Sequence, residues 1–231
     1  MIRLAVIGDG KMGRLVASLA PDRGFEVVAE LGPEATRSGV TREALGGAEV
    51  VVEFTVPTAA AKLVRACATL GVPVVSGTTG WDAERAIVET FVRSTGGALL
   101  WAPNFALGVH LFAKVVAEAS RRFAHPEAGF DAHLVETHHA QKLDAPSGTA
   151  RLLATVAEQA RGRAVPVTSV RTGHVPGTHE LVFDAPFEQV RLVHEARDRR
   201  VFASGALSAA RWLAGKRGVF TLDDFLGEIV R

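Results

Sequence analysis

The segment IRLAVIGDGKMGRLVASL, residues 2–19, decides the fold. Its first six residues are almost all apolar, as expected for a strand that is buried on both faces of a parallel sheet. A glycine-rich turn, GDGKMG at 8–13, follows directly, and the amphipathic pattern after it predicts a helix over 11–19. A strand, a glycine-rich turn and a helix in this order are typical of a dinucleotide-binding unit.

The same alternation of apolar and amphipathic segments continues through the first hundred residues. Strands are expected at 2–7, 25–30, 50–54, 73–75 and 98–101, and helices at 11–19, 59–70 and 82–92. Apolar strands separated by helices are typical of a parallel sheet that is covered on both faces. The prediction is therefore an α/β fold with a Rossmann-type, doubly wound parallel sheet.

The pattern changes after residue 104. Helices are expected at 108–123 and 148–161, and strands at 131–137, 167–171, 180–183 and 190–195. This order predicts an α+β domain with a mostly antiparallel sheet. Residues 206–231 return to helices, with Thr221 placed to cap the last one. We expect a dinucleotide-binding domain at 1–104, completed by 208–231, and a substrate-binding and oligomerisation domain at 105–207.

Composition limits the class of partner. The 26 lysines and arginines nearly balance the 25 aspartates and glutamates, so neither nucleic acid nor a membrane surface is an expected partner. No apolar run reaches the roughly 20 residues of a membrane span. The single cysteine, Cys67, lies on an apolar helix face and is expected to be a buried structural thiol in a cytoplasmic protein.

The glycine-rich turn predicts the pyrophosphate contacts of NADH or NADPH. The residues expected there are Gly8, Asp9, Gly10, Lys11, Met12 and Gly13. Glu30, at the end of the second strand, is expected to bind the adenine ribose, although it is equally compatible with a solvated strand end. Arg37, Ser38 and Lys11 are candidates for the extra phosphate of NADP. The choice between the two nucleotides stays open.

Two further loops follow strands of the same sheet. The first contains Gly77, Thr78 and Thr79, and the second contains Ala102, Pro103, Asn104 and Phe105. Loops at the carboxyl ends of parallel strands line the crevice in which ligands bind. Both loops are therefore predicted to contact the cofactor.

The densest polar cluster is ETHHAQKLDAPSGTA, residues 136–150. His138, His139 and Lys142 together supply protons and positive charge near neutral pH. Ser147, Gly148 and Thr149 stand at a helix start, where free backbone N–H groups favour a carboxylate.

The cluster has two other interpretations. One is an ordinary loop with solvated side chains. The other is a zinc site of His133, His138 and His139, which is disfavoured because adjacent histidines do not match the usual ligand spacing. The expectation is that no metal binds there.

The cluster resembles the signature of the dihydrodipicolinate reductase family. The resemblance extends over nearly the whole chain, through GDGKMGR, VVEFTVP, GTTG, APNFALGV, VPGTHE and LVHEARDRRVFASGAL. It implies NADH- or NADPH-dependent reduction of 4-hydroxy-tetrahydrodipicolinate, a cyclic imine dicarboxylate, on the diaminopimelate route to lysine. By this resemblance His138 donates or accepts a proton and Lys142 is a second proton donor, while His139, Gly148 and Thr149 bind the substrate.

The chain also departs from the family pattern. The fingerprint loop is one residue tighter than usual, and Gly32 stands near the position where some members carry the acidic ribose ligand. His194 and Arg199 match a family stretch, and Arg199 is a candidate for extra positive charge at the substrate.

The resemblance also implies a homotetramer formed through the second domain. The alternatives are another two-domain NAD(P)-dependent imine or amino-acid dehydrogenase, and an NAD-sensing module without catalysis.

Overall fold

The computed structural model describes residues 1–37 and 39–229. The chain divides into two compact units, Met1–Phe105 with Phe202–Arg231, and Ala106–Val201. Each unit is built on one sheet, of six strands in the first and four in the second. Ser38, one of the candidates for the NADP phosphate, lies outside the described residues.

The first unit contains a fully parallel sheet with strand order β10-β5-β4-β3-β1-β2. Its strands are β1 (Ile2–Ile7), β2 (Phe25–Leu31), β3 (Val50–Glu53), β4 (Val74–Ser76), β5 (Ala98–Trp101) and β10 (Gly218–Phe220). Because β1 pairs with both β2 and β3, the direction of winding reverses between β1 and β3. The predicted doubly wound sheet is confirmed.

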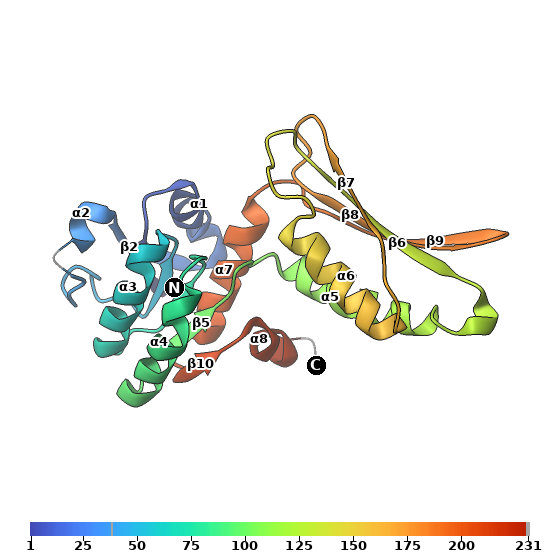
Figure 1. Cartoon of the computed structure of the whole chain (residues 1–231). Coiled ribbons are helices and arrows are strands. Elements are labelled where there is room, and N and C mark those ends of the chain that lie inside the picture. The colour runs from blue at the N-terminus through green and yellow to red at the C-terminus, as the bar shows by residue number, and fades with distance from the viewer. Residues whose placement is uncertain (38, 230–231) are drawn as a thin grey trace. The chain divides into compact units, whose positions relative to one another are not determined.

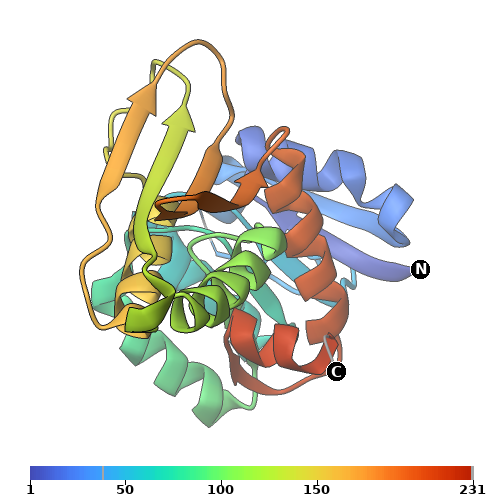
Figure 2. The ribbon, with the colours of Figure 1, turned by 90° about the vertical axis from the view of Figure 1, so that its right-hand side faces the viewer.

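Helices cover both faces of this sheet (Figure 1 and Figure 2). Its helices are α1 (Lys11–Leu19), α2 (Pro33–Thr36), α3 (Pro57–Thr69), α4 (Asp82–Thr95), α7 (Arg200–Leu213) and α8 (Leu222–Ile229), with a 3-10 turn at Pro21–Arg23. Side chains of α3 and α4, among them Val64, Cys67 and Val88, share one apolar core with Ala5 and Val51 of the sheet. Burial raises the pKa of the Cys67 thiol to about 12, which confirms the predicted structural cysteine.

The C-terminal part differs from the sequence prediction in two places. Helix α7 begins at Arg200, where the carboxylate of Asp198 accepts a hydrogen bond of 2.7 Å from the Arg200 N–H, whereas helix was expected only from 206. The short strand β10 was not expected, and it pairs with β5. Thr221 caps α8 as predicted, since its hydroxyl accepts a 3.2 Å hydrogen bond from the Asp224 N–H.

The second unit contains a four-stranded sheet with order β7-β6-β8-β9. Its elements are α5 (Leu107–Arg122), a 3-10 turn (Pro126–Ala128), β6 (Asp131–His138), α6 (Gly148–Arg161), β7 (Val167–Arg171), β8 (Thr178–Ala185) and β9 (Glu188–Glu195). The β6–β7 pair is parallel and the other two pairs are antiparallel. The predicted, mostly antiparallel sheet is confirmed.

Helices α5 and α6 pack on one face of the second sheet (Figure 1 and Figure 2). Leu134 on β6 and Leu181 on β8 pack there against Val116 and Leu153 of the helices, and each such burial contributes roughly 2 kcal/mol. Successive strand residues alternate between faces, so Glu136 and His138 lie on the same buried face as Leu134. The polar site therefore begins where the apolar core of this unit ends.

Within the described residues, none of the helices combines the length and the apolar character that crossing a membrane requires.

Candidate active site

A pocket of about 370 Å³ lies at the carboxyl ends of β1, β2 and β3, where the winding of the first sheet reverses. Three loops contribute its walls. It is lined by Gly8, Asp9, Gly10, Gly32, Pro33, Thr36, Arg37, Phe54, Thr55, Val56, Thr58, Ala59, Lys62 and Leu63. This is the position in which doubly wound sheets bind nucleotides.

The glycines of the fingerprint turn allow close backbone approach. A Cβ atom at Gly8 would lie 2.0 Å from the carbonyl oxygen of Phe54, and one at Gly13 would lie 1.7 Å from the carbonyl oxygen of Gly8. Gly10 has open space beside it among the described residues and stands at the N-cap of α1. Gly8, Asp9 and Gly10 line the pocket, while Lys11 and Met12 begin α1 beyond it.

The end of the pocket near β2 carries positive charge. Arg37 and Lys62 line it, and the Lys62 ammonium donates a 3.5 Å hydrogen bond to the Arg37 carbonyl. Gly32 occupies the strand end, and Glu30 is exposed on β2 and is not one of the residues that form this wall of the described structure. A phosphate group bound at this end would lie near the two cations, Arg37 and Lys62.

A buried carboxylate, Glu53, fixes the loops after β3 and β4, and its role is not predictable from the sequence pattern. The Thr78 hydroxyl donates to it over 2.6 Å and the Ser76 hydroxyl over 2.5 Å, while the Thr55 N–H donates over 2.8 Å. Gly77 must be glycine because a Cβ there would lie 2.0 Å from the Phe54 ring. Thr78 is thus a structural residue of this loop as well as a predicted cofactor contact.

The remaining predicted cofactor residues lie on this loop and the next one. The Thr78 carbonyl accepts hydrogen bonds of 2.8 Å from the indoles of Trp81 and Trp101, while Thr79 is exposed. In the next loop Ala102 and Phe105 are buried, Pro103 is exposed and Asn104 is half-buried.

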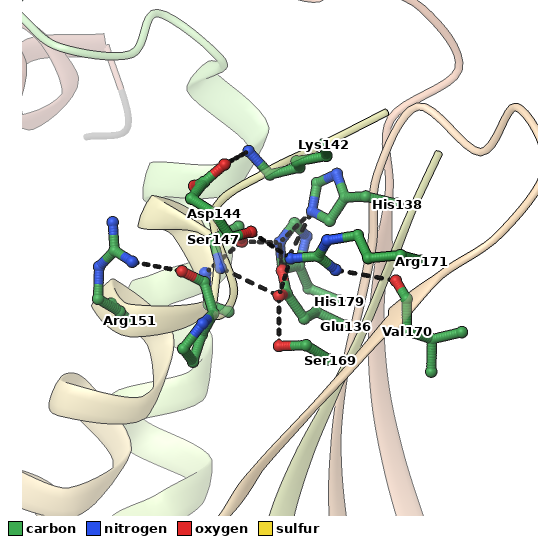
Figure 3. Close-up of polar contacts among 12 residues, drawn as sticks. Glu136, His138, Lys142, Asp144, Ser147, Arg151, Ser169, Val170, Arg171 and His179 are labelled. Carbon is green, nitrogen blue, oxygen red and sulfur yellow. Dashed lines mark hydrogen bonds and ion pairs between the residues drawn. The ribbon is translucent and has the colours of Figure 1, made fainter. Parts of the chain in front are cut away.

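The second polar site is centred on Glu136, which is fully buried on β6 (Figure 3). Its Oε1 atom accepts hydrogen bonds from the Ser147 N–H at 3.0 Å, the Ser169 hydroxyl at 2.7 Å and the Arg171 guanidinium at 2.7 Å. Burial raises the pKa of Glu136, but these donors together outweigh it and bring the pKa down to about 2. Glu136 is therefore a carboxylate at neutral pH.

His138 lies beside this carboxylate. Its Nε2 atom is 3.2 Å from Glu136 Oε2, and its Nδ1 atom is 3.3 Å from the carbonyl oxygen of Pro176. Burial lowers the pKa of His138 below the usual histidine value, and the charge of Glu136 opposes that change. Both ring nitrogens face acceptors, an arrangement that suits the protonated ring.

Two more histidines extend this site across the sheet. The antiparallel registers place His179 of β8 between Glu136 and His194 of β9. His179 Nε2 lies 3.4 Å from His138 Nε2 and 3.2 Å from the Ser147 hydroxyl. Burial lowers the pKa of His179 to about 4, so this ring is neutral at pH 7. His179 lies in the segment VPGTHE, which is part of the family resemblance, but a lone histidine in a strand gives no sequence signal of this role.

The turn after β6 carries the other predicted substrate residues. The Lys142 ammonium forms an ion pair of 2.7 Å with Asp144 (Figure 3). The Lys142 N–H donates to the His139 carbonyl over 3.1 Å. Ser147 caps α6, since its hydroxyl accepts from the Ala150 N–H over 3.1 Å. The exposed Gly148 and half-buried Thr149 form the first turn of α6.

The structure thus brings most of the predicted substrate residues into one unit. Because Glu136 accepts from the Ser147 N–H, it joins the end of β6 to the start of α6. His133 lies on the opposite face of β6 from His138, so the zinc set of His133, His138 and His139 is not assembled. His194 packs against Phe112, with ring centroids 5.8 Å apart, and Arg199 is exposed.

Two family models match the chain. The model described as the N-terminus of dihydrodipicolinate reductase matches residues 2–105, and the one described as its C-terminus matches residues 108–226. A relative named 4-hydroxy-tetrahydrodipicolinate reductase, from Christiangramia forsetii, is 32% identical over an alignment of 245 positions that covers 100% of each chain.

Solved structures share the fold. Dipicolinate-bound dihydrodipicolinate reductase from Paenisporosarcina sp. TG-14 superposes with a TM-score of 0.80, covering 96% of this chain and 97% of that chain at 24% identity. An engineered D-amino acid dehydrogenase bound to NADP+ gives a TM-score of 0.55, covering 96% of this chain and 93% of that chain at 15% identity.

Proposed function

The chain belongs to the dihydrodipicolinate reductase family and reduces 4-hydroxy-tetrahydrodipicolinate on the diaminopimelate route to lysine, and from this premise we propose how its residues divide the work. The pocket at the glycine-rich turn binds NADH or NADPH. The turn between β6 and α6 binds the dicarboxylate and supplies the proton. Each half of the proposal is supported by contacts within one unit of the chain.

The residues of the first pocket fit a dinucleotide. Gly8 and Gly10 let phosphate oxygens approach the backbone at the start of α1, where free N–H groups favour an anion. Asp9, Lys11, Met12 and Gly13 complete this turn, and Arg37 and Lys62 face the far end of the pocket. The loops 77–79 and 102–105 are proposed to flank the nicotinamide, and Glu30 is retained only as a proposed ribose contact. A bound NADH or NADPH supplies the hydride.

The turn 138–149 is proposed to bind the two carboxylates of the substrate. The first turn of α6 offers the N–H groups of Gly148 and Thr149, with Ser147 as its cap. Lys142 and His139 add donors on the other side of the turn. Lys142 is paired with Asp144 in this structure, and an incoming carboxylate competes with Asp144 for its ammonium.

His138 is proposed to supply the proton. Reduction of the substrate consumes one hydride and one proton and releases one water. The 4-hydroxyl group leaves as water together with a hydrogen from the adjacent ring carbon, and hydride then adds to the conjugated ring that results. The electron pair left on the ring is then protonated by His138, with Lys142 as a second donor. Glu136 holds the imidazole in place and favours its protonated form.

The observation that carries the proposal is the position of Glu136. One buried carboxylate holds the N-terminal turn of α6 through Ser147 and lies 3.2 Å from His138 Nε2. The proton donor and the anion-binding helix start are therefore fixed to the same point.

The test is a coupled assay with the purified full-length chain. The substrate is generated in the cuvette from pyruvate and aspartate semialdehyde by the preceding synthase, and oxidation of NADH or NADPH is followed by absorbance. We expect turnover that depends on the synthase. Nucleotide binding without turnover would instead support the sensing module, and turnover with amino acids alone would support another dehydrogenase.

The family resemblance also implies a homotetramer in the cytoplasm. The tetrameric assembly and the cytoplasmic location are both proposals. The second sheet offers apolar side chains for such an assembly, since Val170 on β7 is 38% exposed and Val193 on β9 is 53% exposed. Light scattering on the purified protein tests the tetramer.

A further inference from the structure

Three buried polar atoms converge at the end of β6, one carboxylate oxygen and two imidazole nitrogens. Glu136 Oε2 lies 3.2 Å from His138 Nε2 and 3.8 Å from His179 Nε2, and the two imidazole nitrogens are 3.4 Å apart. The three residues are 0%, 8% and 4% exposed, respectively. Lone pairs this close repel one another in a buried site unless a proton or a metal ion lies between them.

The spacing of these atoms matches that of metal ligands. Zinc binds imidazole nitrogen and carboxylate oxygen at about 2.0–2.2 Å, so neighbouring ligands of a tetrahedral site are about 3.3–3.6 Å apart. The separations between Glu136, His138 and His179 bracket this range. Side-chain shifts of a few tenths of an ångström would bring the three atoms to the spacing of a tetrahedral zinc site.

The surroundings orient two of the three ligands as in metal sites. The Oε1 atom of Glu136 is held by Ser147, Ser169 and Arg171, whereas Oε2 accepts no hydrogen bond from the described part of the chain. The Nδ1 atom of His138 faces the Pro176 carbonyl, which turns its Nε2 lone pair toward the centre. Metal-ligating histidines commonly use their second nitrogen in this way.

We propose that Glu136, His138 and His179 form a Zn²⁺ site with an open fourth position, and that zinc bound there inhibits the reductase. The Ser147 hydroxyl, 3.2 Å from His179 Nε2, lies beside that fourth position. Zinc bound to Nε2 of His138 occupies the lone pair that is protonated in the imidazolium, so the metal and the protonated ring exclude each other. The inhibition rests on the proposed function, but the binding does not.

Binding is tested on the full-length, tag-free chain with zinc chloride alone. Calorimetry above pH 7 is expected to show one tight site per chain, weakened at least about tenfold in Glu136→Gln and in His179→Asn. His133→Asn is the matched control, because it removes a histidine from the other face of the same strand. Circular dichroism confirms that each variant is folded.

X-ray absorption spectroscopy at the zinc edge tests the site in the wild-type protein, without any substitution. We expect two imidazole nitrogens and one carboxylate oxygen at about 2.0–2.2 Å from the metal. Absence of binding, or binding unchanged in both ligand variants, would overturn the site and leave a shared proton between the three atoms.

Inhibition of turnover by zinc is measured in the coupled assay, separately from zinc binding. Zinc should inhibit at the concentrations at which it binds, and a chelator should restore turnover. Full turnover with zinc bound at these residues would overturn the inhibitory role without affecting the binding result. It would also count against His138 as proton donor, whereas lack of turnover in metal-free enzyme would concern only the proposed function.

Discussion

The Nε2 atom of His138 lies 3.2 Å from the carboxylate of Glu136, which the neighbouring donors keep ionised. Burial lowers the pKa of His138, and the negative charge of Glu136 opposes that decrease. A proton donor must be protonated in the free enzyme, so kcat/KM falls as the pH rises through the pKa of His138.

Replacing Glu136 by glutamine should therefore move that fall to lower pH, because the amide cannot stabilise the imidazolium. We expect kcat/KM at neutral pH to decrease about tenfold or more. The pH profile is the informative readout, since a purely structural effect would lower the whole curve without shifting it. An unshifted profile would exclude the electrostatic role of Glu136.

His179 makes folding stability dependent on pH. Its pKa falls from 6.5 to about 4 on folding, so the unfolded chain binds the proton more tightly and stability decreases as the pH is lowered from about 6.5 to 4. Over this pH range the free energy of unfolding should decrease by on the order of 3 kcal/mol. Urea unfolding at several pH values should show a smaller decrease for His179→Asn, while the exposed control His125→Asn should behave as wild type.

Arg37 and Lys62 should favour NADPH over NADH. Arg37→Ala and Lys62→Ala are each expected to raise the KM for NADPH about tenfold and to change the KM for NADH little, because only NADPH carries the additional phosphate. Glu26→Gln, at an exposed position of β2 that does not line the pocket, is the control. Equal effects on both nucleotides would show that the two cations do not contact that phosphate.

Thr78 and Thr79 offer a matched pair for stability. Thr78→Val removes one of the hydroxyl groups that donate to the buried Glu53, at 2.6 Å, and should reduce the free energy of unfolding by about 1–3 kcal/mol. Thr79→Val, at the exposed neighbouring position, should change it by less than about 0.5 kcal/mol. Chemical denaturation of both variants provides the comparison, and similar values would contradict the structural role of Glu53.

Much of the fold was predictable because its elements follow regular apolar patterns. The strand Ile2–Ile7 and the helix Gly148–Arg161 begin and end where their patterns do. Strand β10 was missed because three residues after a turn carry too little periodicity. The start of α7 was missed because its cap, Asp198, lies within a charged segment that has no apolar alternation.

The site was predictable only in part. His138, Lys142 and Ser147 are neighbours in sequence, so their cluster is visible without a structure. Glu136 stood at the edge of that cluster, but its partners Arg171 and His179 come from other strands and meet it only through sheet register. The one local signal was the alternation of Ala132 and Leu134 with Glu136 on the buried face.

The most direct test of the central claim compares turnover with ligand binding in His138→Gln. We predict that kcat in the coupled assay falls by about two orders of magnitude, while the Kd for dipicolinate, measured by calorimetry, stays within about threefold of wild type. Lys142→Met should lose both turnover and dipicolinate affinity. Wild-type kcat in His138→Gln would contradict the assignment of this histidine as the proton donor.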